Sequence, residues 1–258
     1  MEENMRKTHA IIIGILILCI GGLLFGQGSR ESTKTSYVIA HDATWPPLEF
    51  IDENGVLVGF EIDLVKEVAR RTGITFESRN VAWDGIFAGL LNKQYDAIAS
   101  SVTITAERQK QFDFTVPVLR VTQSIMVRTN AQALKTPDDL KFRKVGVQIG
   151  TTGGYAIEGI EGIQVLSYDE IGFAVEDLLN GKVDAVVCDS IIASDFVLSN
   201  PSYSGRLTVS GTASSDTEEL AWVVVKGNTS LRDLLSSTLE AMEADGTTAA
   251  LKKKWNII

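Results

Sequence analysis

The chain has 258 residues, of which 45% are hydrophobic and 22% are charged. This length and composition fit a globular protein that buries sizeable cores, in one large domain or two small ones. The net charge of -9 argues against a nucleic-acid-binding role, because contact with phosphates requires a basic face.

The first residues predict an export signal. Arg6 and Lys7 precede an apolar run at residues 10–25, and small residues follow it, which is typical of a secretory signal. We therefore expect a signal peptide at residues 1–28, a flexible linker at 29–36, and a periplasmic or otherwise extracytoplasmic protein. A retained membrane anchor is the alternative, because the apolar run is only slightly short for a spanning helix.

The sequence contains two cysteines, Cys19 and Cys188. Lipid anchoring at Cys19 is an alternative that the sequence does not favour, because Leu18 precedes it where a lipid-modified cysteine normally follows a small residue. If Cys19 leaves with the signal, no internal disulfide can form. Cys188 is then expected to be a buried, inert thiol in a strand.

Strands and helices alternate along the rest of the chain. Helical spacing of apolar residues runs from Ile62 to Gly73, and Asp84, Thr105 and Thr136 are expected to begin further helices. Strands are expected at 37–40, 48–51, 56–60, 75–80, 97–100, 124–128, 145–148, 164–168 and 185–188, and helices at 230–244 and up to Trp255. This alternation predicts an α/β fold with mostly parallel sheets.

Two segments, NKQYDAIASS and NGKVDAVVCDS, share one layout. Each enters a strand through Asp-Ala, at Asp96 and at Asp184, and then reaches a polar residue, Ser101 or Asp189. Ligands of open α/β sheets bind beyond the carboxyl ends of strands, so Ser101 and Asp189 are expected to line one cleft if the two strands face each other. A coincidence between two common strand starts is the alternative.

Arg108 is the first candidate for binding an anion. It lies in the first turn of the helix begun by Thr105, where the helix dipole disfavours a cation. Together with the hydroxyls of Ser101 and Thr103, its guanidinium is suited to hold a carboxylate through two parallel bonds. An arginine on the open surface is the alternative.

The loop GVQIGTTGGYA is a second anion-binding candidate, because it leaves a strand, turns on glycine and starts a helix near Thr152. It lacks the lysine and the glycine spacing of nucleotide loops, and a simple strand-to-helix turn is the alternative. Asp189 ends an apolar strand and suits an ammonium group. It could instead cap a helix at residues 190–198.

Two tryptophans and two acids complete the candidates. Trp45 and Trp83 lie in loops, where flat rings could hold the body of a ligand and favour a cation, although both could belong to the core instead. Asp42 and Glu49 could contact the distal polar group of a ligand, or merely solvate their loop.

Signatures of catalysis are scarce. The histidines are His9 and His41, no His/Cys cluster has the spacing of a metal site, and no GxSxG motif is present. We therefore expect no enzyme, no metal and no cofactor.

Six motifs in order give the chain a family resemblance, namely ATWPPLEF, GFEIDL, SVTITAERQKQFDFT, GVQIGTTG, VDAVVCD and LEAMEADGTTAALKKKW. From about Tyr37 to Trp255 it resembles the periplasmic amino-acid-binding proteins of ABC importers. That group includes the glutamine-, histidine- and lysine/arginine/ornithine-binding proteins.

The resemblance implies two α/β lobes that are joined by two crossing strands and close over a ligand. Lobe 1 would hold residues 37–118 and 222–258, and lobe 2 would hold residues 121–220. The hinges would lie near residues 118–122 and 218–222.

The resemblance also implies roles for individual residues. The α-carboxylate of an amino acid would be bound by Arg108 and Thr103 with the backbone of Thr152, and the α-amino group by Asp189 and the carbonyl of Ser101.

By the same resemblance, Trp45 and Trp83 would stack on the ligand side chain and Asp42 would meet its far end. Gln148 stands where some relatives carry lysine, which leaves the choice of ligand open.

These roles predict a monomeric solute-binding component of an ABC transporter that passes its ligand to a membrane permease. Asp42, Glu49 and the tryptophans favour a basic amino acid, with glutamine or histidine next. One alternative is a periplasmic dehydratase of the cyclohexadienyl type, which would need a general acid in the cleft. The other is a ligand-sensing module, which usually forms part of a longer membrane chain.

Overall fold

The computed structural model describes residues 34–257. The predicted signal peptide, Cys19 and most of the predicted linker lie outside the described residues. Within the described range, no helix is both long enough and apolar enough to cross a membrane.

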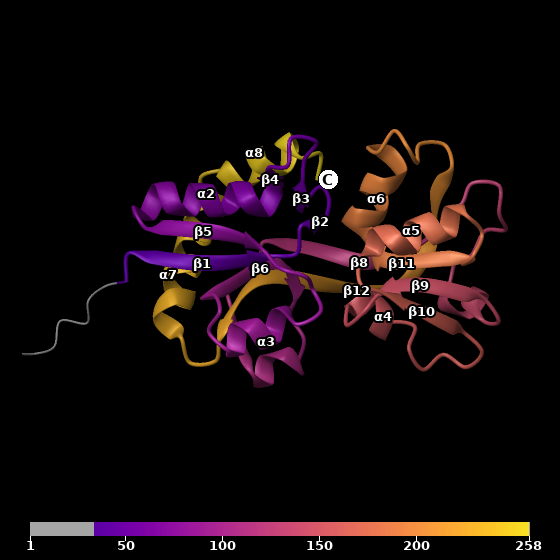
Figure 1. The fold of residues 1–258 in the computed structure, drawn as a ribbon, viewed down its shortest axis with the longest axis horizontal. Coiled ribbons are helices and arrows are strands. Elements are labelled where there is room, and N and C mark those ends of the chain that lie inside the picture. Colours follow the sequence, from indigo (N-terminus) through magenta and orange to yellow (C-terminus); the bar gives the residue numbers. More distant parts are fainter. Residues whose placement is uncertain (1–33, 258) are drawn as a thin grey trace, which may run out of the picture. The chain divides into compact units, whose positions relative to one another are not determined.

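A nine-stranded sheet with strand order β10-β9-β11-β8-β12-β6-β1-β5 organises residues 36–225, and β7 pairs with β12 beside this path (Figure 1). One end of the sheet is a parallel set, β5 (Thr75–Asn80), β1 (Ser36–His41) and β6 (Ala97–Thr103). The other end is also parallel and consists of β10 (Gln164–Tyr168), β9 (Lys144–Gln148) and β11 (Ala185–Asp189). The predicted α/β fold with parallel strands is confirmed at both ends.

Two antiparallel strands, β8 (Leu119–Arg128) and β12 (Leu207–Val225), connect the ends of the sheet. β11 pairs with β8, whereas β6 and β7 (Phe112–Phe114) pair with β12. Leu119 lies opposite Leu220 and Val121 lies opposite Glu218, so the two segments predicted as hinges run side by side. The sequence patterns did not predict β12, because the polar and small residues SGTASSDTEE interrupt its apolar alternation.

Helices cover both ends of the sheet (Figure 1). The helices packed at the first end are α2 (Phe60–Thr72), α3 (Ile86–Leu91), α7 (Thr229–Ala244) and α8 (Thr247–Lys254), and those at the second end are α4 (Thr152–Tyr155), α5 (Ile171–Leu179) and α6 (Ser190–Leu198). The remaining elements are the 3-10 turns η1 (Arg108–Lys110) and η2 (Pro137–Leu140) and a small sheet of β2 (Thr44–Trp45), β3 (Glu49–Ile51) and β4 (Leu57–Val58).

Two predicted helix starts were wrong in detail. α3 begins after Gly85, whose left-handed backbone (φ 93°) turns the chain, and not after Asp84. The segment after Thr105 is a short 3-10 turn, although the Thr105 hydroxyl still accepts a hydrogen bond from the Arg108 N–H at 3.1 Å. The start predicted at Thr136 is confirmed by a capping box.

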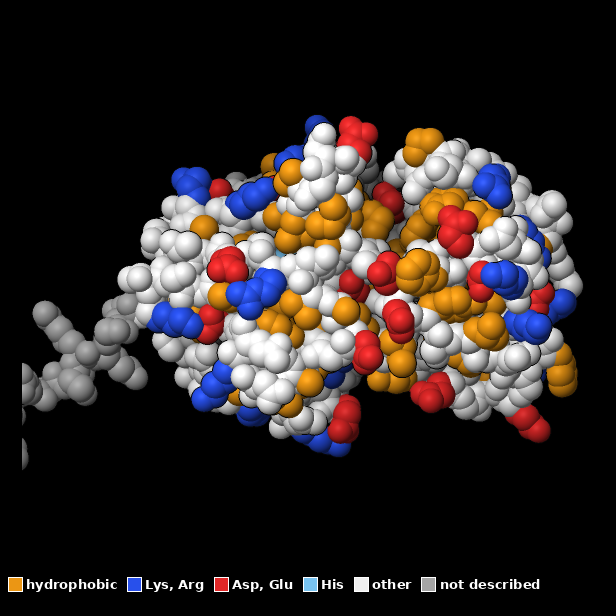
Figure 2. All heavy atoms as spheres, viewed as in Figure 1, with side chains coloured by type: hydrophobic (Ala, Val, Ile, Leu, Met, Phe, Trp, Pro, Cys, Tyr) orange, Lys and Arg blue, Asp and Glu red, His pale blue; other side chains and the backbone are white. Residues whose placement is uncertain are grey.

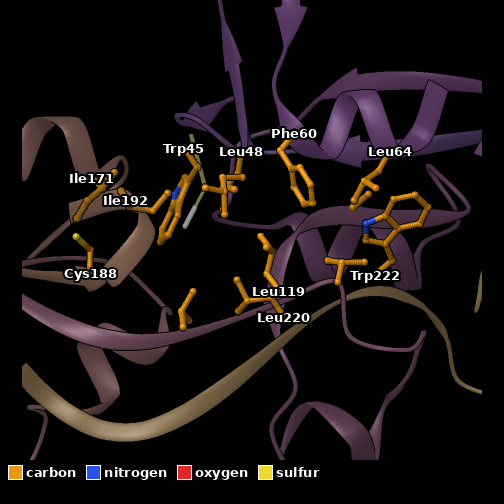
Figure 3. Close-up of a cluster of buried hydrophobic side chains, with 14 of the residues drawn as sticks. Trp45, Leu48, Phe60, Leu64, Leu119, Ile171, Cys188, Ile192, Leu220 and Trp222 are labelled. Carbon is orange, nitrogen blue, oxygen red and sulfur yellow. The ribbon is translucent and has the colours of Figure 1, made fainter. Parts of the chain in front are cut away.

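A buried apolar cluster extends along both connecting strands (Figure 3). Trp222 on β12 and Phe60 on α2 belong to it at the first end, and Ile171 and Ile192 belong to it at the second. Cys188 is a buried free thiol whose pKa is raised by burial, as predicted for an inert core cysteine. This cluster includes Trp45, whereas Trp83 belongs to a separate buried cluster at the first end of the sheet.

Gly59 directly precedes α2 and packs closely against the backbone of Leu48. Its φ is 137°, and a Cβ at this position would lie 2.1 Å from the carbonyl oxygen of Leu48. Gly59→Ala is therefore expected to lower the free energy of unfolding by about 3 kcal/mol, measured by urea denaturation. Gly172→Ala in α5 is the matched control, because its new Cβ would meet no atom within 4 Å. Equal stability of both variants would contradict the close contact at Gly59.

Candidate functional site

A small cavity lies where the carboxyl ends of β6 and β11 meet. The residues around it are Trp45, Trp83, Ser100, Ser101, Thr103, Arg108, Thr151, Thr152 and Asp189. All predicted site residues except Asp42, Glu49 and Gln148 thus line one space. Its volume is only about 10 Å³, close to the minimum that holds one water molecule, so the cavity in this arrangement is too small for an amino acid.

The repeated strand entry brings Ser101 and Asp189 to this cavity. Asp96 accepts a hydrogen bond from the Val38 N–H at 2.8 Å, and Asp184 accepts one from the Lys144 N–H at 2.9 Å. Each aspartate therefore ties the start of its strand to the neighbouring parallel strand in the same way. The two strands then end on opposite sides of the cavity.

Ser101 adopts a left-handed backbone conformation with φ 49°. Its hydroxyl donates to Glu61 at 3.1 Å, and the other oxygen of Glu61 accepts from the Trp222 indole N–H at 2.5 Å. Burial raises the pKa of Glu61 to about 7. Sequence reasoning did not assign Glu61 to the site, although it is the first of the two acids in the GFEIDL motif.

Arg108 reaches across the cavity. Its guanidinium donates to the carbonyl of Thr103 at 2.8 Å and to the carbonyl of Gly150 at 3.1 Å. It also lies over the rings of Trp83 and Phe87, at 5.6 and 5.2 Å from their centroids. The alternative of an arginine on the open surface is therefore wrong.

Asp189 is the N-cap residue that precedes α6, but its side chain makes no capping bond. It accepts a hydrogen bond from the Gln123 amide at 2.7 Å instead, and its exposed fraction is 4%. Burial raises its pKa to about 7, while Gln123 lowers it and the negative charge of Glu218 raises it further. The site thus contains a buried carboxylate that would gain from a cationic partner.

Gln123 is a site residue that sequence reasoning missed. It is fully buried on β8, directly opposite Asp189 on β11, and its amide also lies 3.3 Å from the Thr152 hydroxyl. Nothing in the sequence around Gln123 indicates this role, which follows from the pairing of two distant strands.

Gln148 links the two ends of the protein beside the cavity. Its amide donates to Asp42 at 2.9 Å and to the carbonyl of Asp169 at 3.0 Å, and the Trp45 indole N–H donates to its oxygen. Burial is the main cause that raises the pKa of Asp42 to about 6. Gln148 therefore contacts a predicted side-chain-binding acid instead of lining the cavity.

Glu49 does not solvate its loop, which corrects one of the two alternatives. It is fully buried and accepts a hydrogen bond from the Ser100 hydroxyl at 2.9 Å. Burial, and secondly the charge of Glu61, raise its pKa well above the usual range. The same Ser100 hydroxyl accepts from the Asp42 N–H at 2.8 Å, so Glu49 supports the loop that carries Asp42.

An acidic crevice adjoins the cavity at Trp83. Its volume is about 390 Å³, and its acidic lining residues are Asp42, Asp84, Asp169 and Glu170. Figure 2 shows acidic side chains gathered on the visible face between the two ends of the protein. Clefts lined by one sign of charge attract ligands of the opposite sign.

Known proteins are similar to this chain over most of its length. The chain is 33% identical over 232 residues to the L-cystine-binding protein of Escherichia coli (strain K12), covering 89% of this chain and 86% of that protein. A structure of an ancestral arginine-binding protein bound to arginine is 36% identical, with a TM-score of 0.81, covering 86% of this chain and 98% of that one.

A third relative bears on the enzymatic alternative. It is an ancestral amino-acid-binding protein described as a precursor of cyclohexadienyl dehydratase, 32% identical with a TM-score of 0.79, covering 86% of this chain and 95% of that one. The fold is therefore the two-lobed fold of these neighbours.

Residues 37–257 match the family described as bacterial extracellular solute-binding proteins, family 3. This chain belongs to that family of bacterial extracellular solute-binding proteins.

Proposed function

We propose that this protein binds a free basic amino acid between its two lobes, outside the cytoplasm, and passes it as a monomer to the permease of an ABC importer. Lobe 1 comprises residues 37–118 and 222–258, and lobe 2 comprises residues 121–220. The observation that carries the proposal is that Arg108 and Asp189 line one small cavity, and the proposed bounds assign them to different lobes. Their charges match the two charged groups that every amino acid offers at a fixed separation.

In this proposal, Arg108 and Thr103 bind the α-carboxylate together with the backbone of Thr152. Asp189 binds the α-ammonium group with the carbonyl of Ser101. Both charged groups of the ligand are paired only when the lobes are closed, so the ligand favours closure.

Trp45 and Trp83 contact the ligand side chain in this proposal, and Asp42 attracts its distal cation with support from Gln148. The acidic crevice beside Trp83 supports a basic ligand, because its carboxylates extend the negative field outward from the cavity. The arginine-bound ancestral relative supports the same class. Cystine, for which the E. coli relative is named, is the competing ligand.

We propose a binding protein and not an enzyme. A dehydratase would need a general acid in the cleft, and a protonated Asp189 would be the candidate. In the proposed site, however, Asp189 must be ionised to pair with the ligand ammonium. Turnover of prephenate or arogenate by the purified protein would revive the enzymatic alternative.

A thermal-shift screen against the twenty amino acids and cystine tests the proposed ligand class. Arginine or lysine is expected to raise the melting temperature most, because a ligand that binds only the folded protein stabilises it. If only aspartate or glutamate raised the melting temperature, the basic class would be wrong. No shift with any of these compounds would contradict amino-acid binding itself.

The affinity for arginine is expected to depend on pH. The pKa of Asp189 is about 7 and that of Asp42 is about 6, both raised by burial. Protons therefore compete with the cationic ligand below pH 7, and the association constant should fall by up to about tenfold per pH unit for each proton bound. Calorimetry from pH 5 to pH 9 checks this, and a constant affinity across that range would contradict the assignment.

A further inference from the structure

Glu218 lies on β12 where the strand crosses between the lobes, opposite Val121 on β8. One of its carboxylate oxygens accepts a hydrogen bond from the Thr152 hydroxyl at 2.6 Å and another from the Thr103 hydroxyl at 3.1 Å. Thr103 ends β6 in one lobe and Thr152 begins α4 in the other. A single carboxylate thus joins the hinge strand to both walls of the cavity.

The surroundings of Glu218 are those that a bound amino-acid carboxylate would require. The two hydroxyl oxygens lie 3.2 Å apart. The Arg108 guanidinium is also near: burial lowers the pKa of Arg108, and the negative charge of Glu218 acts in the opposite direction. Each hydroxyl carries one proton, so a proton donated to Glu218 is not available to another acceptor. A ligand carboxylate at this place would have to compete for those protons.

We propose that Glu218 is an internal competitor that occupies the hydroxyls of Thr103 and Thr152 in the closed arrangement and thereby limits the affinity for the ligand carboxylate. This inference rests on the proposed function, because it takes Thr103 and the backbone of Thr152 as the groups that bind the ligand carboxylate. Glu218 has two effects in this scheme. It bridges the lobes through two hydroxyls, of which that of Thr103 is also proposed to bind the ligand and that of Thr152 lies beside the ligand-binding backbone. It also adds a negative charge beside the carboxylate that Arg108 must hold.

Glu218→Gln tests the proposal, because glutamine keeps the shape, removes the charge and offers an amide that can donate to a ligand carboxylate. The dissociation constant for arginine, measured by calorimetry, is expected to fall by about tenfold. Glu219→Gln is the matched control. Glu219 is the next residue on the same strand, and its carboxylate pairs with the exposed Arg120 at 2.7 Å. The control should bind arginine as the wild type does.

A second measurement follows the bridge itself. Small-angle X-ray scattering of the proteins in ligand-free buffer should give a larger radius of gyration for Glu218→Gln than for Glu219→Gln, because the variant loses the charge-assisted contacts between the lobes. In the calorimetric test, a gain of affinity for arginine in Glu218→Gln cannot come from damage to the fold, since such damage would weaken binding.

The two proposals fail in different ways. If the wild type binds arginine and Glu218→Gln binds it equally or more weakly, the competitor role is wrong, and weaker binding would place Glu218 among the groups that attract the ligand ammonium. If the wild type binds no amino acid, the proposed function fails and the competitor role fails with it. A difference in scattering would then support only the bridge between the lobes.

Discussion

We expect Asp189→Ala to lower the affinity for the preferred amino acid by about a hundredfold or more. The substitution removes the buried carboxylate that would pair with the ligand ammonium, and it leaves that ammonium without its charged partner in a closed cavity. Calorimetric titration of the wild type and the variant with the ligand identified by the screen measures the loss. An unchanged affinity would contradict the ammonium-binding role.

Asp189→Asn separates binding from folding. The pKa of Asp189 is 3.8 in the unfolded reference and about 7 in the folded protein, so the folded protein holds a proton that the unfolded chain releases between these values. Stability contributed by that proton is lost as the pH rises through this window. Thermal unfolding of Asp189→Asn above pH 7 should therefore occur at or above the wild-type temperature, although ligand binding is lost. A lower melting temperature would show that the carboxylate stabilises the fold.

The second large effect is expected at Arg108. Arg108→Met should also weaken amino-acid binding by about a hundredfold, because methionine retains part of the packing on Trp83 and Phe87 but cannot donate hydrogen bonds to a carboxylate. The variant also loses the bonds to the carbonyls of Thr103 and Gly150 that position the guanidinium between the lobes.

Arg70→Met is the matched control for Arg108→Met. Arg70 is an exposed residue of α2 that pairs with Glu67. The Arg70→Met variant should therefore bind the ligand as the wild type does. Arg108→Lys adds a test of geometry, since lysine keeps the charge without the planar pair of donors. Full affinity in Arg108→Lys would show that charge alone is sufficient, and full affinity in Arg108→Met would contradict the carboxylate-binding role.

Local signals in the sequence were enough to predict most of the elements. α2 follows from its apolar spacing, from acids in its first turn and arginines in its last, and from the left-handed Gly73 that ends it. β9 and β11 follow from short apolar runs between turns. β12 did not follow, because its polar middle is stabilised by pairing with β8 and not by an apolar pattern of its own.

The residues of the candidate site also fall into two groups, those that local sequence predicted and those that depend on distant partners. Arg108 and Asp189 were predicted because their residue types conflict with a simple local role, a cation near a helix start and an acid at the end of an apolar strand. Gln123 and Glu218 were not predicted, since their partners lie far away along the chain. Gln148 was predicted as a ligand-binding residue, but its bonds to Asp42 and Trp45 join the lobes beside the cavity.

The amino-acid sequence by itself determined the alternation of strands and helices and the two charged residues proposed to bind an amino acid, because propensity, capping and periodicity act over a few neighbouring residues. Only the tertiary structure decided which polar groups meet at the cavity and which carboxyl groups become buried. The physical reason is that burial and hydrogen-bond partners depend on strands brought together from distant parts of the chain. These contacts raise the pKa of Asp189 and direct the Thr103 and Thr152 hydroxyls toward Glu218.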